Sequence, residues 1–130
     1  MAGSKILLDT NVVIALLNRD SAITNGLTDF DEVYLPSIVV GELFLGAMRS
    51  HRVEENISRV ESFCRDCAVL NVNASTGRQY GEVKSRLMNT GRPIPDNDVW
   101  IAAISLQHAI PLLTRDRHFQ SVESLNATIL

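Results

Sequence analysis

The chain has 130 residues, of which 45% are hydrophobic and 21% charged, and its formal net charge is −3. This length and composition are typical of one compact domain with its own core, so we expect a single domain over residues 1–130. Two cysteines are too few for a disulfide scaffold, and the longest apolar run, Val12–Leu17, is far shorter than the ~20 residues of a membrane-spanning helix. We therefore expect a cytoplasmic protein with no membrane segment.

Short apolar runs alternate with helical patterns along the first half of the chain. Lys5–Asp9 is typical of a strand buried on both faces, and Asp9–Asn11 supplies capping side chains for a helix that ends at about Leu17. The next expected elements are a helix over Ser21–Thr28, a strand over Glu32–Leu35 closed by Pro36, a helix from Ile38 to about Arg49 capped by Ser37, a helix over Val53–Cys67 and a strand over Ala68–Val72.

The same alternation continues to the end of the chain. The expected elements are a helix over Ala74–Met88, a non-helical turn at Gly91–Pro95, a helix over Asp96–His108, a strand over Pro111–Thr114, a helical turn at His118–Phe119 and a strand over Ala127–Leu130. Strands that alternate with helices predict an α/β fold with three layers, in which helices flank both faces of a parallel sheet of four to five strands. Functional residues of such a fold lie beyond the carboxyl ends of the strands.

Four acidic residues fall at or near that edge of the predicted sheet. Asp9 ends the first strand, Asp116 follows the strand that ends at Thr114, and Asp98 lies in the first turn of a helix. Glu42 lies in a helix that is apolar nearly all round, which predicts burial and hence a partner for the carboxylate.

Each of these acids also has an ordinary structural explanation. Asp9 can cap the following helix, Asp98 can complement a helix dipole, Asp116 can close a turn and Glu42 can pair with Arg49. Four carboxylates at one edge would not all stay ionised without a cation, however, and oxygen donors favour Mg²⁺ or Mn²⁺ over zinc. Because carboxylate-held Mg²⁺ activates water for attack on phosphate esters, the pattern indicates phosphodiester hydrolysis.

The order and spacing of these motifs resemble those of PIN-domain ribonucleases, and specifically of the VapC toxins of type II toxin–antitoxin systems. The resemblance rests on Ile6–Asn11, Leu35–Leu43, Pro93–Ala103 and Leu113–Asp116 with Phe119. It implies a PIN-like fold and a Mg²⁺-dependent endoribonuclease toxin, with Mn²⁺ as a substitute, that cleaves RNA such as tRNA or rRNA. It also implies a homodimer and a cognate VapB-like antitoxin that blocks the site, in a hetero-oligomer with the toxin.

The resemblance also implies roles for particular residues. The acidic set that binds one or two metal ions is Asp9, Glu42, Asp98 and Asp116. The residues expected to support that set are Thr10, Asn11, Asp96 and Thr114, with Asp96 as a helix N-cap on the side opposite to Asp98. Arg115 and Arg117 flank Asp116 and are candidate contacts to RNA phosphates.

Several other residues have simpler expectations. Cys64 and Cys67 have no second cysteine pair nearby, so we expect inert thiols, and the scattered His51, His108 and His118 are expected in surface or capping roles. Two alternative functions stay open at this point. One is a housekeeping RNA-processing PIN nuclease, and the other is a degenerate PIN-like domain that only binds RNA or protein.

Overall fold

The structure is a computed structural model that describes residues 4–130, so the first three residues of the expected domain lie outside it. One sheet contains five strands, β1 (Lys5–Leu8), β2 (Glu32–Pro36), β3 (Ala68–Leu70), β4 (Leu112–Thr114) and β5 (Ala127–Ile129). Their order across the sheet is β3-β2-β1-β4-β5, and every neighbouring pair is parallel. The predicted parallel sheet is confirmed.

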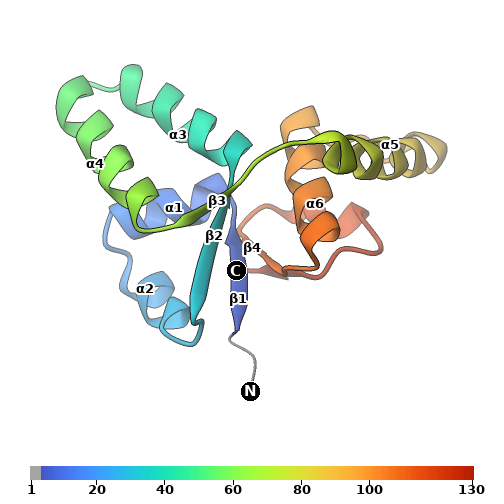
Figure 1. Ribbon diagram of the computed structural model, residues 1–130, viewed down its shortest axis with the longest axis horizontal. Coiled ribbons are helices and arrows are strands. Elements are labelled where there is room, and N and C mark those ends of the chain that lie inside the picture. The colour runs from blue at the N-terminus through green and yellow to red at the C-terminus, as the bar shows by residue number, and fades with distance from the viewer. Residues whose placement is uncertain (1–3) are drawn as a thin grey trace.

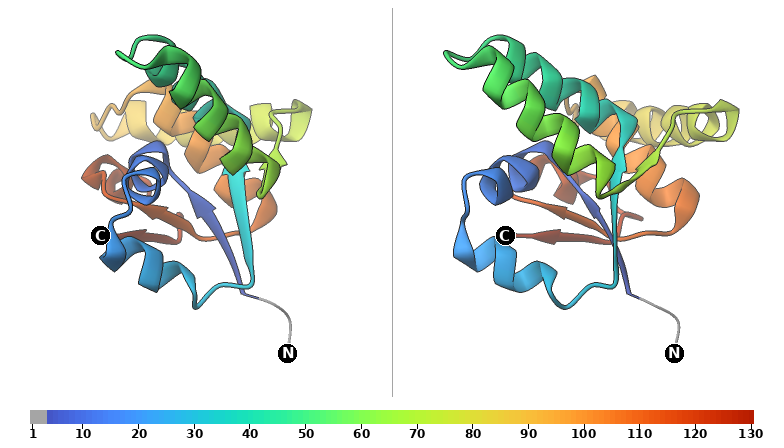
Figure 2. Two further views of the ribbon diagram at one scale, coloured as in Figure 1. Left: turned by 90° about the vertical axis from the view of Figure 1, so that its left-hand side faces the viewer. Right: turned by 60° about the vertical axis from the view of Figure 1, so that its left-hand side comes forward.

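Helices surround this sheet, with α1 and α2 on one side of β1 and β2, and with α5 and α6 on the other (Figure 1). The helices are α1 (Thr10–Leu17), α2 (Ser21–Leu27), α3 (Ser37–Met48), α4 (Val53–Arg65), α5 (Ala74–Asn89) and α6 (Asp96–His108), and a short 3-10 helix, η1, covers Arg117–Ser121. Figure 2 shows α3 and α4 side by side above the carboxyl end of β2. The three-layer α/β/α fold is confirmed, and no helix within residues 4–130 is long and apolar enough to cross a bilayer.

The apolar runs fill the core because parallel strands inside a layered fold are covered on both faces. Ile6, Leu7 and Leu8 of β1 are at most 1% exposed, and Leu112 of β4 is fully buried. Phe119 of η1 is 1% exposed and fixes that short turn against the core. The strands that carry Asp9 and Asp116 to the sheet edge are therefore among the most buried parts of the fold.

Two expected helix caps are wrong. The residues at the N-cap positions of α3 and α6 are Pro36 and Pro95, and neither helix start has a side-chain cap. Both prolines have extended backbone conformations, with ψ of 141° and 144°, so the helical conformation begins directly after them. Ser37 and Asp96 are already the first helical residues, past the position from which a cap accepts the free backbone N–H groups.

The expectation that α3 is buried nearly all round is also wrong. Val39, Leu43 and Ala47 form its buried stripe, whereas Leu45 and Met48 are 61% and 57% exposed. Helix α3 packs on α1 and α4 through that stripe and leaves an apolar outer face.

The packing of α5 on α6 fixes the start of α6. The rings of Tyr80 on α5 and Trp100 on α6 stack with their centroids 4.1 Å apart and their planes at 19°. Asp96 accepts hydrogen bonds from Lys84 Nζ at 2.8 Å and from the Tyr80 hydroxyl at 3.1 Å. These contacts hold the first turn of α6, which carries Asp98.

Helix α5 begins with a complete capping box, and the contribution of this cap to stability can be measured directly. The Asn73 side chain accepts a hydrogen bond from the Thr76 N–H at 3.1 Å, and the Thr76 hydroxyl accepts one from the Asn73 N–H at 3.0 Å. We expect Asn73→Ala to lower the free energy of unfolding by about 1–2 kcal/mol in urea titrations. Asn89→Ala, at the exposed other end of α5, is the control, and equal stability of the two variants would contradict the role of the cap.

Candidate metal centre

The pairing of β1 with β4 brings two of the predicted acids to one edge of the sheet. The Asp9 N–H donates to the Leu113 carbonyl at 3.0 Å, so Asp9 continues the ladder one residue past β1. Asp116 follows β4 on the adjacent strand end. Helix α6 supplies Asp98 from its first turn, and α3 supplies Glu42 from its middle.

Asp9 is the most buried of the four, with 4% of its surface exposed. Its Oδ2 accepts hydrogen bonds from the Thr114 hydroxyl at 2.6 Å and from the Asn11 amide at 3.2 Å. Its Oδ1 accepts the Thr10 N–H at 2.8 Å, so Asp9 also caps α1, as expected. Burial, together with the nearby charge of Asp116, raises the pKa of Asp9 despite these hydrogen bonds.

Glu42 is half-buried and faces Asp9 across the start of α1. Its Oε1 accepts a hydrogen bond from the Thr10 hydroxyl at 2.9 Å. Burial and the charge of Asp9 raise the pKa of Glu42, although Thr10 and the nearby Asn97 side chain act to lower it. Among the described residues its hydrogen-bond partner is Thr10, so the alternative expectation of an ion pair with Arg49 is wrong.

Asp98 is affected by the charges of the three other acids. Its side chain is 14% exposed, and burial together with the charges of Asp9, Asp116 and Glu42 raises its pKa from 3.8 to about 6. The charges of the other three acids thus all act on Asp98, which is the arrangement that a bound cation relieves.

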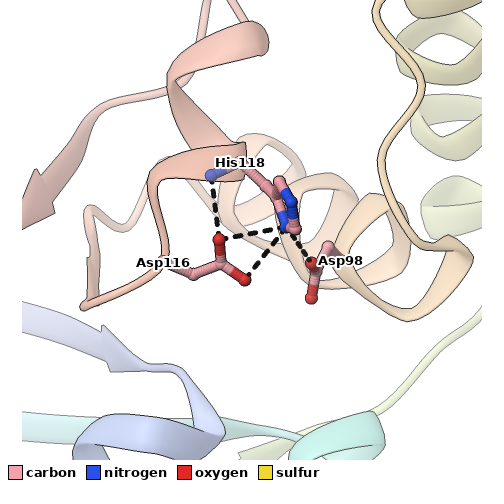
Figure 3. A group of neighbouring side chains, drawn as sticks. All are labelled: Asp98, Asp116 and His118. Atoms are coloured by element: carbon pink, nitrogen blue, oxygen red, sulfur yellow. Dashed lines mark hydrogen bonds and ion pairs between the residues drawn. The ribbon is translucent and has the colours of Figure 1, made fainter.

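Two acids and one histidine come near enough to share a single ion (Figure 3). Asp98, Asp116 and His118 each offer a ligand atom within 4.8 Å of the others, and this group does not include Asp9 or Glu42. His118 Nδ1 lies 3.0 Å from Asp116 Oδ1 and 3.7 Å from Asp98 Oδ2. His118 was expected only in a surface or capping role. Its position two residues after Asp116, in an expected helical turn, is the feature of the sequence that indicates a place near that acid.

Thr114 and Asn11 connect the site to the backbone. The Thr114 hydroxyl donates to Asp9 and accepts the Asp116 N–H at 3.0 Å, so one side chain orients both acids. The Asn11 amide donates to Asp9, while its carbonyl oxygen accepts the Arg115 N–H at 3.0 Å.

The structure places the remaining predicted residues outside this cluster. Asp96 is bound to Lys84 and Tyr80, away from the four acids. The Arg115 guanidinium pairs with Asp20 at 2.8 Å, whereas Arg117 is exposed at the start of η1. Cys64 and Cys67 form no disulfide, and burial raises the pKa of both thiols, that of Cys67 to about 11, which keeps them protonated near neutral pH.

The donor set fits a divalent metal ion. It consists of carboxylate oxygens with one imidazole nitrogen, and the raised pKa values of three carboxyl groups reflect burial and repulsion that a cation would offset. Oxygen-rich sites with room for water ligands are typical of Mg²⁺ and Mn²⁺.

The raised pKa of Asp98 predicts how stability depends on pH without metal. The folded chain keeps Asp98 protonated up to about pH 6, whereas the unfolded chain loses that proton near the ordinary pKa of 3.8. Asp98 therefore contributes its full stability to the fold below the ordinary pKa, and this contribution is lost as pH rises through the folded value. We expect metal-free Asp98→Asn to have a free energy of unfolding about 1–3 kcal/mol above that of the wild type at about pH 7.5, measured in urea with EDTA.

Asp96→Asn is the matched control for this measurement, two residues earlier on the same helix. The contact with Lys84 lowers the pKa of Asp96. The ionised Asp96 therefore stabilises the folded chain above its ordinary pKa, and this stabilisation is lost as pH falls through the folded value. We expect no gain in stability from Asp96→Asn near neutral pH. An Asp98→Asn protein less stable than the wild type would contradict the inference that the other acids repel the Asp98 carboxylate.

The chain matches known proteins over nearly its whole length. The model of the PIN domain matches residues 6–125. Ribonuclease VapC1 of Haemophilus influenzae is 32% identical over 92% of this chain and 92% of its own. The tRNA(fMet)-specific endonuclease VapC of Shigella flexneri is 27% identical over 93% of this chain and 94% of its own.

Solved structures show the same likeness in three dimensions. VapBC-1 from nontypeable Haemophilus influenzae superposes with a TM-score of 0.88 at 30% identity, and the match covers 96% of this chain and 97% of that one. VapBC2 from Rickettsia felis, bound to a DNA fragment from its promoter, gives 0.89 at 25% identity over 96% and 98% of the two chains. Sequence and fold agree along the same residues, and the chain therefore belongs to the PIN domain family and, within it, to the VapC ribonucleases.

Proposed function

We propose that the chain is the Mg²⁺-dependent endoribonuclease toxin of a toxin–antitoxin pair, and that Asp9, Glu42, Asp98 and Asp116 form its active site. The observation that carries this proposal is the convergence of the four carboxylates from β1, α3, α6 and the end of β4, with raised pKa values for three of them. Its membership of the VapC ribonucleases gives the reaction class.

The site residues have distinct tasks in this proposal. When bound, Mg²⁺ supplies charge neutralisation at the phosphate and lowers the pKa of a coordinated water. Asp98 and Asp116 would hold the ion together with Asp9, and Thr114 fixes the orientation of Asp9 and Asp116. Glu42, which Thr10 orients, lies beside Asp9, and burial together with the charge of Asp9 raises the pKa of its carboxyl group, which suits a group that exchanges protons with a reacting water.

The substrate that we propose is RNA, cleaved at a phosphodiester in the cytoplasm. Arg117 is exposed next to Asp116, where a guanidinium can bind an RNA phosphate, whereas Arg115 would have to exchange its pairing with Asp20 for such a contact. The printed name of the Shigella flexneri relative specifies tRNA(fMet) for that protein. For this chain, tRNA and rRNA are both substrates to test, and the housekeeping nuclease and binding-only alternatives are outcomes of the same test.

Cleavage of total RNA with mapping of the fragment ends tests the proposal. We expect discrete fragments with Mg²⁺, none with EDTA, and a loss of rate of at least about 10²-fold in Asp9→Asn and Asp98→Asn, because each substitution removes a charged metal ligand. Asp96→Asn should keep the rate within about threefold, because Asp96 lies away from the four acids and the Asn side-chain oxygen can still accept the hydrogen bonds from Lys84 and Tyr80 that hold this turn.

Two results would contradict the proposal. Cleavage that persists in EDTA would remove the metal from the mechanism. A folded chain that binds RNA without cutting any of it would favour the binding-only alternative.

We further propose an antitoxin that seats in a groove next to the active site. The solved relatives from Haemophilus influenzae and Rickettsia felis are VapBC structures, and VapBC-5 from Mycobacterium tuberculosis is a member of the VapBC family of toxin-antitoxin systems. In this chain, a groove of about 260 Å³ lies between α1, α3 and α4, with Glu42 and Arg59 among apolar residues. Ile14 lines it and is 48% exposed, so a partner segment seated there would cover apolar surface and reach Glu42. The homodimer stays a prediction.

Inhibition by the proposed antitoxin tests this groove. We expect Ile14→Arg to cleave RNA at the wild-type rate but to need at least about tenfold more antitoxin for half inhibition, because the longer charged side chain fills the groove and removes the apolar contact with the partner segment. Leu45→Arg is the control, since Leu45 is 61% exposed on α3 but does not line the groove. Equal inhibition of the wild type and Ile14→Arg would place the antitoxin elsewhere.

A further inference from the structure

We propose that His118 is a metal ligand of this site, and that with Asp98 and Asp116 it forms a mixed nitrogen and oxygen centre that prefers Mn²⁺ to Mg²⁺. This inference rests on the proposed function, because it concerns the same metal centre. It goes beyond that function because it assigns a ligand outside the acidic set and a metal preference.

The distances around His118 fit a shared ion. Nδ1 lies 3.0 and 3.2 Å from the two oxygens of Asp116 and 3.7 Å from Asp98 Oδ2. Ligand atoms at right angles around one octahedral ion, each about 2.1 Å from it, are about 3.0 Å apart. The distances from Nδ1 to Asp116 match this spacing, whereas the distance to Asp98 is longer, so the Asp98 carboxylate would move inward to share the ion. All three ligand atoms lie within 4.8 Å of one another, and it is Nδ1 that faces the carboxylates (Figure 3).

The turn that carries His118 is fixed at both ends. Asp116 Oδ1 accepts the His118 N–H at 2.9 Å, so the acid and the histidine are tied together through the backbone. Phe119, the next residue, is 1% exposed in the core. The orientation of the imidazole thus depends on a short, anchored helix, which lowers the conformational entropy lost when it binds an ion.

Exposure leaves room for the rest of the coordination shell. The side chain of His118 is 56% exposed, that of Asp116 is 30% and that of Asp98 is 14%. One side of the cluster of Asp98, Asp116 and His118 is therefore open to solvent, so water or a phosphate oxygen can complete the ligand set. Imidazole nitrogen binds first-row transition metals well, whereas Mg²⁺ prefers an all-oxygen shell.

A simpler role for His118 is a hydrogen bond from Nδ1 that only positions Asp116. The two roles differ in one observable, which is whether a histidine nitrogen is bonded to the ion. His118→Asn keeps an amide near the place of Nδ1, able to donate to Asp116, but removes the imidazole. His118→Ala removes both interactions.

The experiment is electron spin-echo spectroscopy of Mn²⁺ bound to the RNA-free chain, with Mn²⁺ and Mg²⁺ affinities measured by calorimetry. We expect a directly bonded ¹⁴N signal in the wild type, which changes to ¹⁵N when histidine is ¹⁵N-labelled. The signal should be absent in His118→Asn and His118→Ala and present in His108→Ala, a control at the other end of α6. Both His118 variants should weaken Mn²⁺ binding about tenfold or more and Mg²⁺ binding less than about threefold.

The contrary outcomes separate this inference from the proposed function. If Mn²⁺ binds and RNA is cleaved, but the nitrogen signal is absent or persists in His118→Asn, then His118 is not a ligand and the nuclease proposal stands. If the folded chain binds neither Mn²⁺ nor Mg²⁺, both proposals are wrong.

Discussion

The parallel pairing of β1 with β4 determines where the chemistry of this molecule can occur. The two strands are neighbours at the centre of the sheet, although more than 100 residues separate Asp9 from Thr114 along the chain. The Thr114 hydroxyl then joins them at their carboxyl ends, because it donates to Asp9 and accepts the backbone N–H of Asp116. The buried apolar runs of β1 and β4 hold this edge in register, so core packing and site geometry have one cause.

The site concentrates negative charge where water is partly excluded, which opposes folding when no cation is bound. Burial is the largest contribution to the raised pKa of Asp9, Glu42 and Asp98, and repulsion between the acids adds to it. The hydrogen bonds from Thr10, Asn11 and Thr114 offset part of this cost at fixed positions. Such a preformed site lowers the free energy of unfolding of the metal-free chain, and a bound ion would raise it again.

Much of the fold follows from local sequence, because the apolar runs and helix patterns depend on neighbours along the chain. The run at Lys5–Leu8 and the cap at Asp9 are read directly from it. The errors in the expected caps and burial arise where backbone geometry or tertiary contacts, rather than local sequence, determine the structure. Helix α3 starts at Ser37, one residue earlier than expected, and Pro95 takes the cap position of α6 that was expected for Asp96. The outer face of α3 stays exposed although its residues are apolar. The spacing of two residues indicates that His118 lies near Asp116, but His118 reaches Asp98 only because η1 packs next to α6, a tertiary contact that this spacing does not predict.

The stacking of Tyr80 on Trp100 has a practical consequence for following this site. Trp100 is the single tryptophan of the sequence, and it lies two residues beyond Asp98 on the same helix. Its ring rests on Tyr80 of α5, next to the contact between Lys84 and Asp96. The molecule thus contains its own fluorophore at the turn that carries Asp98, and the emission of Trp100 reports rearrangements of that turn in the unlabelled protein.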